Sequence, residues 1–158
     1  MEPGQNLGRY RVLESAIRIL LGLVFLLYGL DKVSHPDIFA RSIANYRLLP
    51  GVFVNLMAVV LPWVEVLCGL LLIFGQWIRA AALVSGFLLV VFMIAVSIAL
   101  VRGLDISCGC FNTNGGRKVG MKLLGEDLLL LAMSFVLILK ARDRVGWGAV
   151  RGFGQRGQ

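Results

Sequence analysis

Cys108 and Cys110 carry the most evident chemistry in this sequence, because they form a Cys-Gly-Cys motif between two long apolar runs. A thiolate is the nucleophile of thiol–disulfide exchange, and a connection between apolar runs gives it the access that exchange requires. A Cys-x-Cys disulfide closes a smaller ring than a Cys-x-x-Cys disulfide, and strained disulfides are the labile ones. Gly109 relaxes the backbone restriction inside that ring. The motif therefore favours a redox pair.

Two other interpretations of Cys108 and Cys110 stay open. The pair is also compatible with a static structural disulfide or with two idle thiols. Two thiolates supply half of a tetrahedral zinc site, but the chain has no second cysteine pair, and its single histidine, His35, lies in another connection. We therefore assign no metal site, and zinc binding by the pair stays an alternative. The third cysteine, Cys68, lies within an apolar run, where it is either a small buried hydrophobe or a partner for the pair.

Two carboxylates, Glu65 and Asp127, are the next candidates. Glu65 lies inside an apolar run shortly after Pro62. A carboxyl group at membrane depth is costly, so we expect Glu65 to face the protein interior and either hold a partner or stay protonated. It is a candidate for a proton relay or a ligand contact, or for an interhelical hydrogen bond beside a proline kink. Asp127 follows Glu126 near the start of the last apolar run, where acidic residues suit a helix N-terminus.

The apolar runs that must position these residues indicate an integral membrane protein. Of the 158 residues, 58% are hydrophobic, and the mean hydropathy is +0.83. A membrane-spanning helix needs ~20 mostly apolar residues. Four runs meet this length, which predicts an all-α, four-helix transmembrane bundle forming a single domain over residues 12–139. The expected spans are residues 12–30, 55–74, 80–101 and 123–139, with disordered tails at 1–8 and 141–158.

The net charge of +7 predicts membrane topology rather than nucleic-acid binding, because the basic residues are spread over tails and connections. They are nearly balanced between the two sides, so the basic C-terminal tail decides the orientation. This tail favours both termini in the cytoplasm. Cys108 and Cys110 then face the periplasm, where disulfides persist. We expect a multi-pass protein of the bacterial cytoplasmic (inner) membrane, surrounded by the lipid bilayer.

The connection after the first run predicts a short amphipathic helix on the outer surface. Pro36 suits the first turn of a helix, and Asp37 adds a negative charge there. Over residues 37–49, apolar side chains recur at helical spacing. The reverse face is polar and holds Arg41, Ser42, Asn45 and Arg47. This helix would lie on the same side as the cysteine pair, as a lid over a redox site or as an ordinary interfacial helix.

Several short elements, taken in order, resemble a known family. They are Asn45-Tyr46-Arg47-Leu48-Leu49-Pro50, Leu61-Pro62-Trp63-Val64-Glu65, Gly69, Gly75, the segment from Arg102 to Phe111 with its Cys-Gly-Cys-Phe motif, and Glu126-Asp127. With these elements the chain resembles the MauE branch of the MauE/DoxX family of small membrane proteins, over about residues 17–139. The resemblance implies a four-helix bundle similar to vitamin K epoxide reductase and the disulfide-bond-forming membrane enzymes.

The function that this resemblance implies is thiol–disulfide oxidoreductase chemistry supporting periplasmic disulfide formation or electron transfer. The family context is methylamine utilisation and maturation of methylamine dehydrogenase, with a periplasmic thioredoxin-like protein or a disulfide-containing substrate as partner. By position, Cys108, Cys110, Glu65 and Asp127 are the matching site residues. The chain lacks the second cysteine pair of the epoxide-reductase type, so no cofactor is assigned and a quinone stays an open candidate. The alternatives are a non-enzymatic membrane scaffold or assembly factor, and a DoxX-like small subunit of a quinol-oxidising complex.

Overall fold

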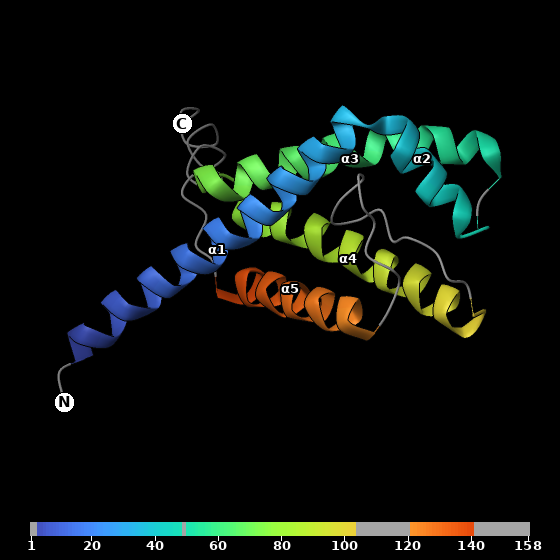
Figure 1. Cartoon of the computed structure of the whole chain (residues 1–158). Helices are drawn as coiled ribbons and strands as arrows, with labels where there is room; N and C mark the ends of the chain where they lie inside the picture. The colour runs from blue at the N-terminus through green and yellow to red at the C-terminus, as the bar shows by residue number, and fades with distance from the viewer. Residues whose placement is uncertain (1–2, 49, 104–120, 141–158) are drawn as a thin grey trace, which may run out of the picture.

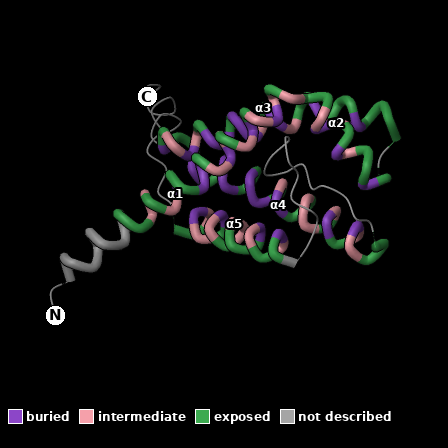
Figure 2. The backbone as a smooth tube through the Cα atoms, viewed as in Figure 1, coloured by how far each residue is buried: buried purple, intermediate pink, exposed green. Residues whose placement is uncertain are grey.

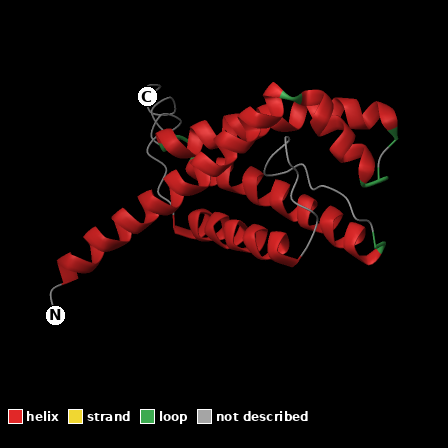
Figure 3. Cartoon of the chain, viewed as in Figure 1, coloured by secondary structure: helices red, strands yellow, loops and turns green. Residues whose placement is uncertain are grey.

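The described part of the chain is entirely helical, apart from short turns (Figures 1 and 3). The structure is a computed structural model, and it describes residues 3–48, 50–103 and 121–140. Five helices follow one another within these ranges: α1 (Pro3–Ser34), α2 (Pro36–Asn45), α3 (Gly51–Phe74), α4 (Ile78–Val101) and α5 (Met121–Lys140). The all-α prediction is confirmed.

Three of these helices are long and apolar enough to cross a membrane. They are the 12–34 part of α1, α3 and α4. Helix α5 was predicted as a fourth span, but it does not meet the same criterion, since four charged residues, Lys122, Glu126, Asp127 and Lys140, fall within its 20 residues. Exposed residues lie along the outward faces of the helices (Figure 2). Many of them are large and apolar, as expected for contact with lipid. Examples are Leu23, Leu27, Leu67, Phe74, Leu83 and Phe87.

The helices are arranged as two packed pairs (Figure 1). Helix α1 packs chiefly on α3, and α4 packs chiefly on α5, while α2 lies against the N-terminal part of α3. Glycines allow the close approach of α1 and α3, because a Cβ added at Gly69 would lie 2.8 Å from the carbonyl oxygen of Gly22. In the other pair, the Ser134 hydroxyl donates to the carbonyl oxygen of Ala82 at 2.6 Å. Small residues and an interhelical hydrogen bond thus hold the pairs.

Two turns set the direction of the chain. Gly75 ends α3 in the left-handed conformation with φ 73°, and the N–H of Gln76 donates to the carbonyl oxygen of Leu71 at 3.0 Å. The side chain of Arg18 from α1 is buried against Gly75, where its positive charge suits the C-terminus of α3. At the opposite end, Pro36 begins α2 directly after α1. The ends of α1 and α4 and the starts of α3 and α5 therefore share one end of the bundle (Figure 1).

Several element boundaries differ from the predictions. Residues 3–8 were predicted to be a disordered tail but are helical, since α1 begins at Pro3, a residue suited to a first helical turn. Helix α1 also continues past the predicted end at residue 30 as far as Ser34. Helix α2 ends at Asn45 rather than at residue 49. The predicted tail at 141–158 lies outside the described residues.

The predicted polar face of α2 is partly wrong. Ser42 was placed on the solvent face with Arg41, yet Ser42 is buried with Phe39. Its hydroxyl donates to the carbonyl oxygen of Ile38 at 3.0 Å, so the backbone satisfies the buried side chain. A serine that bonds to its own helix fits an apolar contact, and the buried stripe of α2 is consequently wider than the sequence pattern indicated.

Candidate functional site

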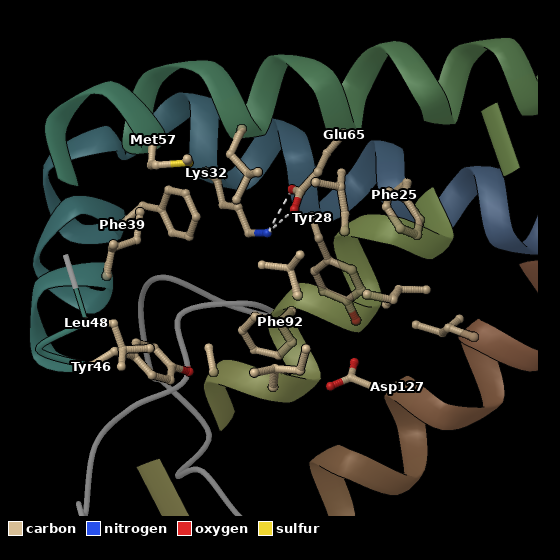
Figure 4. Close-up of a pocket in the computed structure, with 18 of the residues that line it drawn as sticks. Phe25, Tyr28, Lys32, Phe39, Tyr46, Leu48, Met57, Glu65, Phe92 and Asp127 are labelled. Carbon is tan, nitrogen blue, oxygen red and sulfur yellow. Dashed lines mark hydrogen bonds and ion pairs between the residues drawn. The ribbon is translucent and has the colours of Figure 1, made fainter. Parts of the chain in front are cut away.

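An apolar cavity of about 360 Å³ lies between the two helix pairs, at the end of the bundle where α4 ends and α5 begins (Figure 4). All five helices contribute to its walls. The lining consists mostly of aliphatic and aromatic side chains, and charged groups enter it at three positions. These are Lys32 of α1, Glu65 of α3 and Asp127 of α5. An apolar cavity with a few convergent polar groups is the usual form of a ligand site.

Lys32 and Glu65 form a buried ion pair at one side of this cavity. The Lys32 Nζ donates to both carboxylate oxygens of Glu65, at 2.7 Å each. The side chains are only 6% and 12% exposed. Lys32 Nζ also lies 5.0 Å from the ring centroid of Phe39 in α2, a cation–π distance. Each charge therefore compensates the other in a place where either alone would be costly.

Helices α1 and α3 approach each other closely, and this allows the Lys32 side chain to reach Glu65. A Cβ added at Gly29 would lie 3.1 Å from the Cβ of Glu65 and 3.0 Å from the backbone nitrogen of Val66. Lys32 is one helical turn beyond Gly29, so its side chain starts beside α3 at the level of Glu65. Pro62 lies one turn before Glu65 in α3, where it removes one backbone hydrogen bond. The glycine sets the distance that the lysine has to span.

Asp127 is the most deeply buried acid in the described part of the chain, at 1% exposure. Its side chain extends from α5 toward the cavity, separately from the Lys32–Glu65 pair (Figure 4). Among the residues that the structure describes, its Oδ2 has no hydrogen-bond partner. A buried polar atom without a partner costs free energy, so packing alone does not explain its presence. Asp127 is thus a polar group available to a bound molecule.

Tyr46, which follows α2, closes the cavity beside α4. Its ring is buried and meets the Phe92 ring edge-to-face, with centroids 6.5 Å apart and an interplanar angle of 73°. Burial raises the pKa of Tyr46 to about 12, and the negative charge of Asp127 adds to the shift. The hydroxyl consequently stays protonated and can donate a hydrogen bond. Tyr28 of α1 contributes a second phenol ring to the lining (Figure 4).

Two of the four predicted site residues, Glu65 and Asp127, line the same cavity although they come from different helix pairs. The other two, Cys108 and Cys110, lie outside the described residues. Cys68 is buried beside Ser85 of α4. Since a helix rises about 1.5 Å per residue, Ser85 lies about 24 Å along α4 from the end that leads to the cysteine pair. This position does not favour Cys68 as a partner of Cys108 or Cys110.

Sequence reasoning missed Lys32 and Tyr46. Lys32 was interpreted as a basic residue just outside the first span, and the structure corrects this, because α1 continues to Ser34 and buries the lysine. The useful signal was Glu65 itself, which required a partner, together with a lysine directly after an apolar run. Tyr46 stood in one of the family-like elements, but nothing in its local pattern assigned it a role.

The sequence of this chain was compared with models of known protein families. A family model described as methylamine utilisation protein MauE matches residues 10–140. The chain belongs to the MauE family. The matched region contains both cysteines of the Cys-Gly-Cys motif and every charged residue of the cavity. The MauE-family match therefore covers nearly the whole described structure.

Individual MauE proteins give the same assignment. The chain is 33% identical to methylamine utilization protein MauE of Paracoccus denitrificans over 123 residues, which is 77% of this chain and 66% of the relative. It is 32% identical to the MauE protein of Methylophilus methylotrophus over 73% of this chain and 62% of that protein. For the MauE protein of Methylorubrum extorquens, the identity is 32% over 80% and 68%. The chain thus spans slightly less than two thirds of the first two relatives. No solved structure matches it.

Proposed function

We propose that this MauE-family membrane protein is a thiol-redox protein whose exchanging pair is Cys108 and Cys110. It would support periplasmic disulfide formation or electron transfer, as a MauE-like factor in methylamine utilisation and the maturation of methylamine dehydrogenase. Its partner would be a periplasmic thioredoxin-like protein or a disulfide-containing substrate. Oxidation of two thiols to a disulfide releases two electrons and two protons, so the function also needs an acceptor, for which a quinone is the proposed cofactor.

The observation that carries this proposal is the position of the cavity relative to the two ends of the cysteine-bearing connection. Helix α4 ends at Val101 and α5 begins at Met121, and both ends lie where Lys32, Glu65 and Asp127 enter the cavity. Asp127 lies only about 9 Å along α5 from its start. The connection that carries the thiol pair is thus joined at both ends to the part of the bundle that holds the buried carboxylates Glu65 and Asp127. This arrangement supports a coupled transfer of electrons and protons.

The proposal includes a topology with four crossings of the bacterial cytoplasmic membrane. Helix α5 supplies the fourth crossing, because its most unfavourable charge, Asp127, is buried inside the bundle rather than exposed to lipid. Both termini would then be cytoplasmic and the cysteine pair periplasmic. The bundle would be similar to those of vitamin K epoxide reductase and the disulfide-bond-forming membrane enzymes.

A second candidate is a non-enzymatic scaffold or assembly factor that anchors a partner and contains a structural disulfide. The exposed apolar face of α3, with Phe53 and Trp63, is compatible with packing against another membrane protein. A DoxX-like small subunit of a quinol-oxidising complex is a third candidate. The scaffold differs from the thiol-redox protein in one testable respect, since the scaffold retains its function when the thiols are removed.

The deciding experiment is thiol trapping on intact cells with a membrane-impermeant maleimide, in a Cys68→Ala background. We expect Cys108 and Cys110 to react only after mild reduction, which is the behaviour of an outward-facing disulfide. Free reaction without reduction indicates resting thiols, and no reaction under either condition indicates inverted topology or occlusion. A Cys108→Ser variant should retain partner binding and lose disulfide transfer. Unchanged disulfide transfer in this variant would favour the scaffold.

A further inference from the structure

We propose that the cavity between the two helix pairs binds the ring of a lipid-soluble quinone, with Lys32 and Asp127 as its polar contacts. The inference rests on the proposed function in one respect, namely that the thiol pair would be the electron donor to the quinone. The evidence for binding is the cavity itself. Three properties support it: access from the lipid, aromatic walls, and two separated polar groups, one of which lacks a partner among the described residues.

Exposed apolar side chains of α3 and α4 line one side of the cavity. The lining includes Met57 of α3 and Val91 and Ile94 of α4, whose exposed fractions are 41%, 48% and 55%. Both helices are long and apolar enough to cross a membrane, and these residues lie within them. An opening bordered by exposed apolar side chains of membrane-spanning helices admits molecules from the hydrocarbon layer. The ligand is therefore a membrane-soluble molecule rather than a water-soluble one.

The walls suit a planar ring. Phe25, Tyr28 and Phe92 line the cavity from α1 and α4 (Figure 4). Aromatic side chains pack on flat rings in offset or edge-to-face geometry. The volume of about 360 Å³ lies at the lower end of the usual ligand range, which suffices for a substituted ring whose tail leaves through the mouth into the bilayer.

The polar groups match the two oxygens of such a ring. An ammonium group has three N–H donors, and in the described residues Glu65 accepts two hydrogen bonds from Lys32, which leaves a donor for a carbonyl oxygen. Asp127 enters from another wall, and its Oδ2 accepts a hydrogen bond from the hydroxyl of the reduced ring. An acyl chain would fill the same space but leave this oxygen unpaired. The buried acid therefore favours a quinone over a lipid tail.

The reaction that this site completes is balanced. Cys108 and Cys110 lose two electrons and two protons as their S–S bond forms. The quinone takes up two electrons and two protons and becomes the hydroquinone. The hydroquinone leaves through the lipid mouth, and the disulfide passes to the thiol partner.

Binding can be measured on full-length protein in nanodiscs made from quinone-free phospholipid. Equilibrium dialysis under anaerobic conditions against a short-tailed ubiquinol, the reduced form whose hydroxyl can donate to Asp127, should give saturable binding at one site per chain. Asp127→Leu should weaken binding about tenfold, the loss expected when a hydrogen bond to a buried charged group is removed. Asp37→Asn, which changes an exposed acid of α2 outside the cavity, should bind like the wild type. Absence of saturable binding, or equal binding by Asp127→Leu, would overturn the proposal.

A second variant tests the location of the ring without removing a charge. Ala95→Phe places a ring in the cavity from α4 and should abolish binding. Ala132→Phe, on the exposed side of α5, is its control. If Ala95→Phe folds and still binds quinone, the ring lies elsewhere and the proposal is wrong.

The thiol pair separates this inference from the proposed function. A Cys108→Ser, Cys110→Ser double variant should bind quinone with unchanged affinity. If quinone binds while the double variant still supports disulfide formation, the site stands and the redox function fails. If thiol exchange proceeds in a protein that binds no quinone, the function stands and the site fails.

Discussion

The ammonium group of Lys32 lies 2.7 Å from both carboxylate oxygens of Glu65, and this contact joins the end of α1 to the middle of α3. Both side chains are almost fully buried. The pair therefore holds two charges inside an apolar bundle, at the wall of the cavity between the two helix pairs. Loss of this ion pair should therefore lower the folding stability of the protein.

Removing one partner of this pair should be strongly destabilising, because the other charge is left buried and uncompensated. We expect Lys32→Met to lower the free energy of unfolding by about 3–5 kcal/mol. The double variant Lys32→Met, Glu65→Leu should recover most of this loss, since it leaves no buried charge. The free energies of unfolding of the single and the double variant can be measured in mixed micelles with increasing SDS. Lys122→Met, an exposed lysine of α5, is the control, and an equal loss in that variant would contradict the explanation.

Asp127 should lower the free energy of unfolding of the protein when no ligand occupies the cavity. Its Oδ2 is buried without a hydrogen-bond partner among the described residues. We expect Asp127→Leu to raise the free energy of unfolding by about 1–3 kcal/mol, the cost of an unsatisfied buried group. Asp37→Asn should lower it by less than about 1 kcal/mol, because only a helix-dipole interaction is lost. Unfolding in quinone-free micelles decides the point, and a less stable Asp127→Leu protein would show that the acid has a structural partner.

The sequence pattern was sufficient to predict the helices but not the contacts between them. Apolar runs identified the cores of α1, α3 and α4, since lipid exposure leaves a continuous signal in the sequence. Boundaries were less accurate, because polar residues such as Lys32 continue a helix once a partner compensates them. The predicted burial of Glu65 is confirmed at 9% exposure. The identity of its partner depends on how α1 crosses α3, which Gly22, Gly29 and Gly69 determine together.

The cavity itself could not be predicted. Its residues come from five helices and are separated by long stretches of sequence, and most are ordinary aliphatic side chains. Asp127 stood out only as an acid near a helix start. That it faces the same cavity as Glu65 is a consequence of α4 and α5 packing as a pair against α1 and α3. Such an arrangement has no local sequence signal.

The contact between α1 and α3 should be sensitive to a single methyl group. A Cβ added at Gly69 would lie 2.7 Å from the backbone nitrogen of Leu26, so the helices must move apart. We expect Gly69→Ala to lower the free energy of unfolding by about 1–3 kcal/mol. Gly125→Ala in α5, where a Cβ meets nothing within 4 Å, should instead raise it by about 0.5–1 kcal/mol through helix propensity. Equal effects of the two substitutions would refute the close-packing argument.

Helix α5 should cross the membrane, although its charges exclude it from the helices that qualify by composition. Its exposed residues Leu128, Leu129 and Phe135 are apolar, while Asp127 is buried. The exposed face of α5 is therefore apolar, as in a membrane-spanning helix. Epitope tags at the two ends of the chain should therefore be protected from protease on the same side of the membrane. Single-cysteine labelling at Gln76, in the turn between α3 and α4, gives the reference side, since Gln76 lies on the side of the N-terminus whether or not α5 crosses. A C-terminal tag on the opposite side would mean that α5 does not span and that the bundle has three crossings.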